Sequence, residues 1–105
     1  MATQKQFDNY SLTFNAYPNP VNPAHLNLYS GQTRVGSVSF RKDYPLPANS
    51  ISNGVIFLHM HINLLDGIMN LLRYEKPLQI GLQPDNVSGF IGTWGREQAG
   101  EQEGV

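Results

Sequence analysis

Two histidines, His59 and His61, are separated by one residue and give the strongest chemical signal in the sequence. They lie in the apolar run VIFLHMHI, which favours a β-strand. Alternate side chains of a strand share a face, so these two imidazoles would lie about 7 Å apart along the chain. That spacing suits two ligands of one metal ion, with His25 as a candidate third ligand. The alternatives are structural or solvent-facing histidines, or a pH-sensitive interface.

The residues around the pair limit the metal hypothesis. The pattern is similar to the metal motif of cupins, in which a glycine precedes a His-x-His pair and a glutamate and a third histidine follow it. Gly54 precedes the pair here, but no glutamate occurs before Glu75 and no histidine follows His61. No serine has a nucleophile-elbow sequence, and no two carboxylates fall on one obvious face. The sequence therefore assigns no catalytic residue and no cofactor, and we expect a non-enzymatic protein.

Aromatic side chains offer a second kind of chemistry. Tyr29, Tyr44 and Trp94, together with many asparagines and glutamines, could bind a carbohydrate or another small polar ligand if they are exposed. The alternative is that these rings line strand edges, as in other small β-rich domains.

The elements that must position these side chains form a predicted α+β fold. Alternating or apolar runs predict strands, and the leucine-rich segment after Ile62 predicts one helix, in the order β-β-β-β-α-β-β. Asn63 and Asp66 have the spacing of a capping box, and Pro77 ends the helix. We expect a mainly antiparallel sheet of about five to six strands with the helix packed on one face. The predicted strands are residues 10–16, 25–29, 34–40, 55–62, 78–82 and 89–94.

One predicted strand has an irregular pattern. In RVGSVSF, Val38 and Phe40 share a face, but Val35 is out of phase with them. Gly36 is where a β-bulge could absorb this slip.

Composition and charge limit the class of protein. The 105 residues include no cysteine, 14% are charged, and the net charge is −1. Because the few basic residues are scattered, we expect no nucleic-acid partner. No segment has the pattern of a signal peptide or a membrane span, so we expect a cytoplasmic protein. We predict a single domain at residues 7–95, a flexible N-terminus at 1–6 and an acidic disordered tail at 96–105.

The predicted helix has more apolar side chains than one sheet face needs. Leu65, Met69 and Leu72 are therefore candidates for an interface, and a weakly charged protein has little repulsion to oppose association. We expect a homodimer, or a complex with an unidentified protein partner.

The end of the predicted helix, LLRYEKP, contains a short recognisable motif. Leu72, Arg73, Glu75 and Pro77 match an L-R-N-E-x-P motif, with tyrosine in place of the asparagine, and the ending GTWGREQAGEQE matches a G-E-x-E tail loosely. On these residues the chain resembles a group of small uncharacterised bacterial single-domain proteins, some of them carried on integron gene cassettes. The resemblance implies a small self-associating α+β domain and implies no activity.

Overall fold

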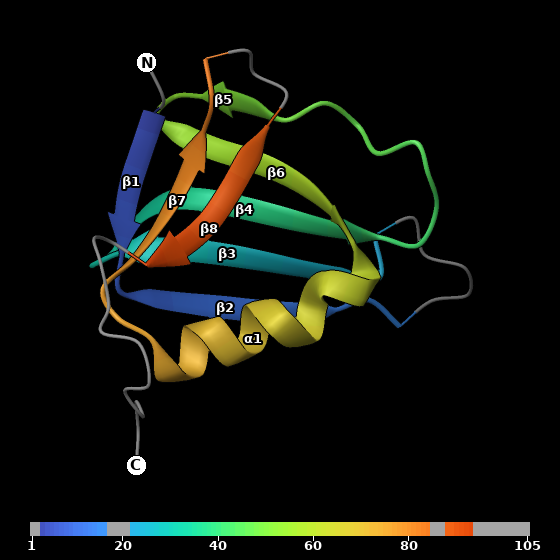
Figure 1. The fold of residues 1–105 in the computed structure, drawn as a ribbon, viewed down its shortest axis with the longest axis horizontal. Coiled ribbons are helices and arrows are strands. Elements are labelled where there is room, and N and C mark those ends of the chain that lie inside the picture. The colour runs from blue at the N-terminus through green and yellow to red at the C-terminus, as the bar shows by residue number, and fades with distance from the viewer. Residues whose placement is uncertain (1–2, 17–21, 85–87, 94–105) are drawn as a thin grey trace.

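The computed structural model describes residues 3–16, 22–84 and 88–93, which form an α+β fold of two β-sheets and one α-helix (Figure 1). The front sheet has the strand order β1-β7-β8, and the back sheet has the order β2-β3-β4-β6-β5. The front sheet contains β1 (Thr3–Phe7), β7 (Leu78–Leu82) and β8 (Gly89–Thr93). The back sheet contains β2 (Asn9–Phe14), β3 (Ala24–Ser30), β4 (Thr33–Arg41), β5 (Ser50–Ser52) and β6 (Val55–His61). A 3-10 turn, η1 (Ile62–Leu64), leads into α1 (Leu65–Tyr74).

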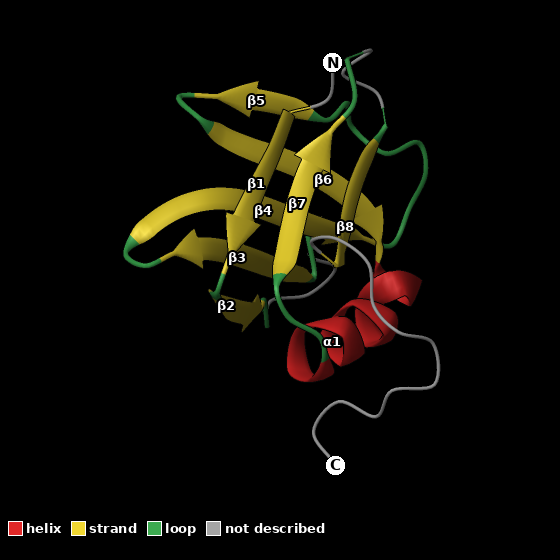
Figure 2. Cartoon of the chain, turned by 60° about the vertical axis from the view of Figure 1, so that its left-hand side comes forward, coloured by secondary structure: helices red, strands yellow, loops and turns green. Residues whose placement is uncertain are grey.

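The predicted fold class is confirmed, because a single helix accompanies mostly antiparallel strands. The strands are divided between two sheets, however, and the strands of the front sheet cross those of the back sheet at a steep angle (Figure 2). In both views α1 lies beside β2, at the edge of the back sheet. The core between the sheets consists of Phe7, Ala24, Leu26, Leu28, Val35, Val38, Phe40, Ile56, Leu58, Leu72, Leu78, Ile80 and Leu82.

The strand pairing includes one parallel pair. β4 and β6 run in the same direction, with Ser39 opposite His59. A parallel connection must return the chain to the starting end of the sheet. The segment 42–49 makes this return, and β5 then pairs antiparallel with β6 at the sheet edge.

The predicted β-bulge is confirmed at Gly36. Leu28 pairs with Gly36, but the next residue of β3, Tyr29, pairs with Arg34. Val35 is therefore the extra residue of β4, and the bulge turns its side chain into the core, where it is 8% exposed.

Three local predictions are wrong. Residues from Thr3 onward form β1 rather than a flexible N-terminus, because they pair with β7 and bury Phe7. A short strand, β5, occurs in a segment that the sequence indicated as loop. The side chain of Asn63 does not cap the helix, because η1 comes first and His61 caps that turn.

The predicted acidic tail at 96–105 and Trp94 lie outside the described residues. Within the described ranges, no helix is long and apolar enough to cross a membrane.

Candidate functional site

The histidines of the sequence lie on the outer face of the back sheet, which is the face turned away from the front sheet. Ser39 of β4 pairs with His25 of β3 on one side and with His59 of β6 on the other. His61 follows on the same face of β6, opposite Arg41. The structure thus gathers histidines from two strands around one stretch of β4.

His25 is held by two serine hydroxyls. Its Nε2 atom lies 2.8 Å from Ser37 Oγ, and its Nδ1 atom lies 3.2 Å from Ser39 Oγ. A neutral imidazole offers one donor and one acceptor, and a hydroxyl can play either role, so both contacts can be satisfied at once. Ser37 is only 2% exposed. The pair therefore has the spacing of a nucleophile and its base, but the hydroxyl is closed to solvent, and among the described residues the imidazole contacts serines and no carboxylate.

His59 is fixed through its backbone and unpaired at its ring. Its N–H donates to Asn49 Oδ1 at 2.9 Å, which ties β6 to the segment 42–49. Its Nδ1 atom is buried and has no hydrogen-bond partner among the described residues, and the same holds for Nε of Arg41. Burial lowers the pKa of His59, and the positive charges of Arg41 and His25 lower it further.

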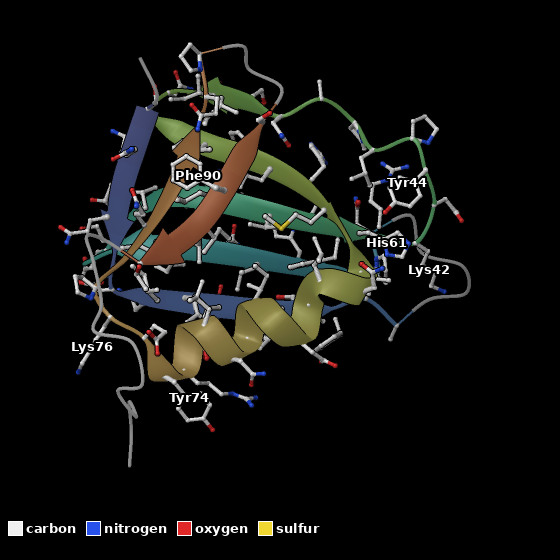
Figure 3. All side chains as sticks on the ribbon, viewed as in Figure 1. Lys42, Tyr44, His61, Tyr74, Lys76 and Phe90 are labelled. Carbon is white, nitrogen blue, oxygen red and sulfur yellow. The ribbon has the colours of Figure 1, made fainter. Side chains whose placement is uncertain are left out.

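Both ring nitrogens of His61 are engaged. Nδ1 accepts the N–H of Asn63 at 3.1 Å, so it carries no hydrogen, and Nε2 lies 2.8 Å from the carbonyl oxygen of Lys42. The ring is therefore the Nε2–H tautomer, which donates to that carbonyl. Tyr44 stacks on it with ring centroids 5.0 Å apart (Figure 3). His61 caps η1 and anchors the chain after β4, and it offers no free nitrogen to a metal ion.

The metal hypothesis therefore gains no ligand set. No group of three or more metal-binding side chains forms within residues 3–16, 22–84 and 88–93. His25 and His59 do lie close enough to affect each other electrostatically, but His61 does not join them as a ligand.

The aromatic residues proposed for ligand binding are not brought together. Tyr29 lies at the bulged end of β3, opposite Arg34, whose guanidinium is 5.6 Å from the ring centre of Phe57. Tyr44 is 69% exposed and lies beside His61. Trp94 is outside the described residues. Neither Tyr29 nor Tyr44 is among the residues that line the two grooves described below.

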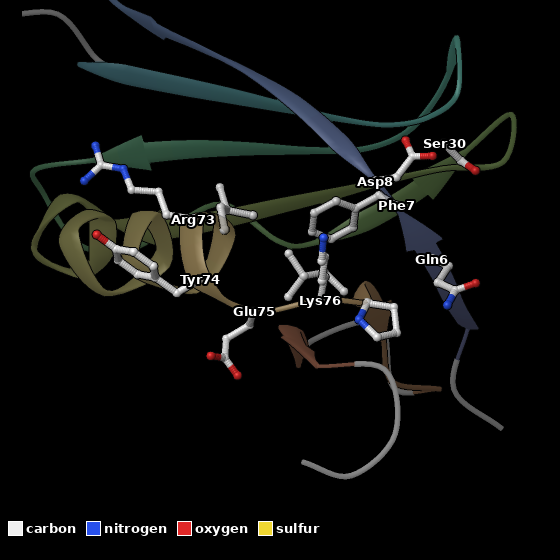
Figure 4. Close-up of a pocket in the computed structure, with 11 residues that line it drawn as sticks. Gln6, Phe7, Asp8, Ser30, Arg73, Tyr74, Glu75 and Lys76 are labelled. Carbon is white, nitrogen blue, oxygen red and sulfur yellow. The ribbon is translucent and has the colours of Figure 1, made fainter. Parts of the chain in front are cut away.

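Two grooves of the surface are considered as binding sites. The larger of the two lies between the end of β1 and the connection from α1 to β7, and its volume is about 580 Å³. Figure 4 shows Lys76 and Phe7 near its middle, with Arg73 and Tyr74 on the helix side and Gln6 on the other. Buried Phe7, Leu72 and Leu78 contribute apolar surface. The motif residues Arg73, Glu75 and Pro77 therefore surround this groove. We call it the β1–α1 groove.

The predicted interface residues lie in two different environments. Leu65 and Met69 are half-buried and line a second groove, with Leu12 and Phe14 of β2 opposite them. Leu72 is 8% exposed and packs in the core, so it is not available to a partner. Leu64, the last residue of η1, is 52% exposed.

We call His25, His59 and His61, together with Ser37, Ser39 and Arg41 of β4, the histidine cluster. The three β4 residues were not predicted from the sequence, because their alternation is typical of any half-exposed strand. Their nearness to His25 and His59 follows from the strand order, which a single sequence does not contain.

Comparison of the chain with protein-family models, with curated proteins and with solved structures found no match. The class defined by fold and site is thus a small two-sheet α+β domain with a polar histidine cluster on one face and two surface grooves.

Proposed function

We propose that the protein is a non-enzymatic interaction module that forms a homodimer. The observation that carries this proposal is a partly exposed apolar strip formed by β2 and the adjacent side of α1. Phe14, which is 63% exposed, lines the second groove together with Leu12, Leu65 and Met69. The polar side chains of Asp66, Asn70 and Arg73 line the same groove. We call the four apolar residues the β2–α1 surface.

The sequence of β2 supports contact with another chain. Among the described strands, β2 pairs only with β3, so it forms an edge of the back sheet. Natural edge strands are usually protected by a charge or a proline. The sequence of β2, NYSLTF, contains neither. β2 therefore carries neither of these two protections in its own sequence, and the apolar side chain of Phe14 on this edge strand is 63% exposed.

The histidine cluster supports a non-enzymatic role. Ser37 and His25 are the nearest approach to a nucleophile and base, and the serine is buried while the histidine contacts a second serine in place of an acid. A serine nucleophile needs both access and an oriented base.

The oligomeric state tests the proposal. The chain has a mass of 11.7 kDa, and we expect light scattering to give twice this mass at about 100 µM protein. Phe14→Ser should weaken the dimer without unfolding the monomer, because this side chain is mostly exposed. Ile51→Ser is the matched control, since Ile51 is 42% exposed on β5, at the opposite edge of the sheet.

A monomeric mass for the wild-type protein would refute the homodimer. Equal weakening by both substitutions would show that general apolar exposure, and not the β2–α1 surface, causes association.

The β1–α1 groove favours a second candidate function, the binding of a small ligand with an apolar part and charges of both signs. Its volume of about 580 Å³ is within the range of roughly 300–1,000 Å³ usual for ligand pockets. Lys76 and Arg73 supply positive charge, Asp8 and Glu75 supply negative charge, and Phe7 supplies apolar surface. Phenylalanine is a suitable probe in a ligand-observed NMR experiment. Lys76→Met should weaken its binding, whereas Lys42→Met, which removes a charge elsewhere, should not.

The cellular context is also a proposal. We propose a bacterial protein of the cytoplasm, of the accessory kind carried by mobile elements. The support is the resemblance of LLRYEKP to small integron-cassette proteins.

A further inference from the structure

The histidine cluster contains two buried polar atoms that need an explanation. Nε of Arg41 and Nδ1 of His59 have no hydrogen-bond partner among the described residues. Most buried polar side-chain atoms in folded proteins are paired, and the exceptions often mark a bound water, an ion or a functional site. The two atoms belong to side chains that affect each other electrostatically.

The groups around these atoms are basic or neutral. Arg41 and His25 both act on His59 with positive charge, and both disfavour its protonation. The serine between the histidines, Ser39, has a hydroxyl that is 3.2 Å from His25 and can also donate to a ligand. Positive side chains beside hydroxyl donors are typical of sites for oxyanions.

From these observations we infer that the outer face of the back sheet binds a small oxyanion, phosphate or a phosphate monoester, between Arg41, His59 and His25. The guanidinium of Arg41 donates Nε–H to the anion. His59 donates from its unpaired nitrogen in its protonated form, and Ser39 adds a hydroxyl. The inference does not depend on the homodimer proposed above.

This site predicts proton uptake on binding. Burial and electrostatic repulsion from Arg41 and His25 disfavour protonation of His59 in the free protein, and a bound anion offsets this repulsion. The groups that face His59 are Arg41 from β4 and His25 from β3, and His61 lies two residues further along β6. β5 contributes no titratable residue, and the segment 42–49 contributes exposed Lys42, Asp43 and Tyr44.

An NMR pH titration of the three histidines, with and without inorganic phosphate, tests the inference on the wild-type protein. We expect phosphate to raise the apparent pKa of His59 by about half a unit or more. The signal of His61, whose two nitrogens are already bonded, should not change. Glycerol phosphate and sulfate show which anion the site prefers. A site for phosphate monoesters binds glycerol phosphate at least as tightly as inorganic phosphate, and a general oxyanion site also binds sulfate.

Two variants and one control complete the test. Arg41→Gln and Ser39→Ala should each weaken phosphate binding, the former about tenfold or more because it removes a charged donor. Lys42→Gln removes the same charge from the next, exposed position and should leave binding within about twofold at 0.15 M salt. An unchanged pKa of His59 in phosphate overturns the inference. Equal losses in Arg41→Gln and Lys42→Gln also overturn it, because they indicate only an adventitious ion.

Discussion

Gly36 of the back sheet lies close against Ile80 of the front sheet, and replacing it with alanine provides a direct test of the packing between the sheets. A Cβ at this position would lie 2.6 Å from Cδ1 and 3.1 Å from Cγ2 of Ile80, which belongs to the front sheet. It would also lie 3.4 Å from Cδ1 of Leu28. Ile80 and Leu28 are both fully buried, so neither can move into solvent.

The magnitude follows from these contacts. Carbon atoms pack best at about 3.5–4.0 Å, so Cδ1 of Ile80 must move by roughly 1 Å. Overpacking of this kind costs about 1–3 kcal/mol. The loss of glycine's freedom in the unfolded chain offsets about 0.4–1 kcal/mol of that cost. We expect Gly36→Ala to lower the free energy of unfolding by about 1–2 kcal/mol, which is roughly 5–15 °C in Tm.

Urea unfolding of four proteins measures the effect: wild type, Gly36→Ala, Ile80→Val and the double variant. Ile80→Val removes the atom at 2.6 Å and alone should cost about 0.5–1.5 kcal/mol. In the Gly36→Ala background it should cost nothing or stabilise, a coupling of about 1 kcal/mol or more. Gly67→Ala is the matched control, because Gly67 is exposed in α1 with nothing within 4 Å, and it should stabilise.

Two results would refute this reasoning. If Gly36→Ala is as stable as the wild type, the sheets do not approach at this residue. If the effects of Gly36→Ala and Ile80→Val simply add, the two residues are not in contact.

Three further predictions concern local interactions. Burial, Arg41 and His25 lower the pKa of His59, so the unfolded state binds more protons than the folded state just below about pH 6.5, and the free energy of unfolding falls as the pH drops there. Between about pH 7.5 and 5.5, urea unfolding should show a smaller loss of stability for His59→Asn than for the wild type. Equal losses in the two proteins would contradict this. Asp8→Ala should cost about 1 kcal/mol in urea unfolding, because Asp8 Oδ1 accepts the N–H of Gly31 at 3.1 Å and closes the β3–β4 turn; an unchanged midpoint would show that water replaces the bond fully. Gly31→Ala should cost about 1 kcal/mol or more, because Gly31 has φ +62; a thermal melt equal to that of wild type would indicate a different turn.

The sequence was most informative where one local pattern determines the structure. Alternation placed β3 and β4, the phase slip at Val35 located the bulge, and Pro77 marked the end of the helix within a few residues. These features depend on neighbouring residues alone, so a single sequence contains them.

Features that depend on long-range pairing could not be predicted. Residues 3–7 have only Phe7 as a large apolar side chain, and their strand exists because β7 lies beside them. Likewise, the His-x-His spacing of His59 and His61 was found from the sequence, but the different roles of the two rings were not. His61 is satisfied by Lys42 and Asn63, whereas the partners of His59 come from the fold: Arg41 and His25 reach it because β4 lies between β3 and β6.

The front sheet also has a consequence for how the chain folds during its synthesis. β1 is made first, but its partner β7 ends at Leu82, so Thr3 waits for most of the chain before it meets the residue opposite. β2 to β6 can pair earlier, because every pairing in the back sheet joins segments closer in sequence. Closing so long a loop costs chain entropy. This cost is offset when Phe7 and Ile80 of the front sheet make their core contacts, late in synthesis. On a ribosome, the back sheet would therefore expose its inner apolar face until the last strands emerge, and this interval is when the nascent chain is most open to aggregation.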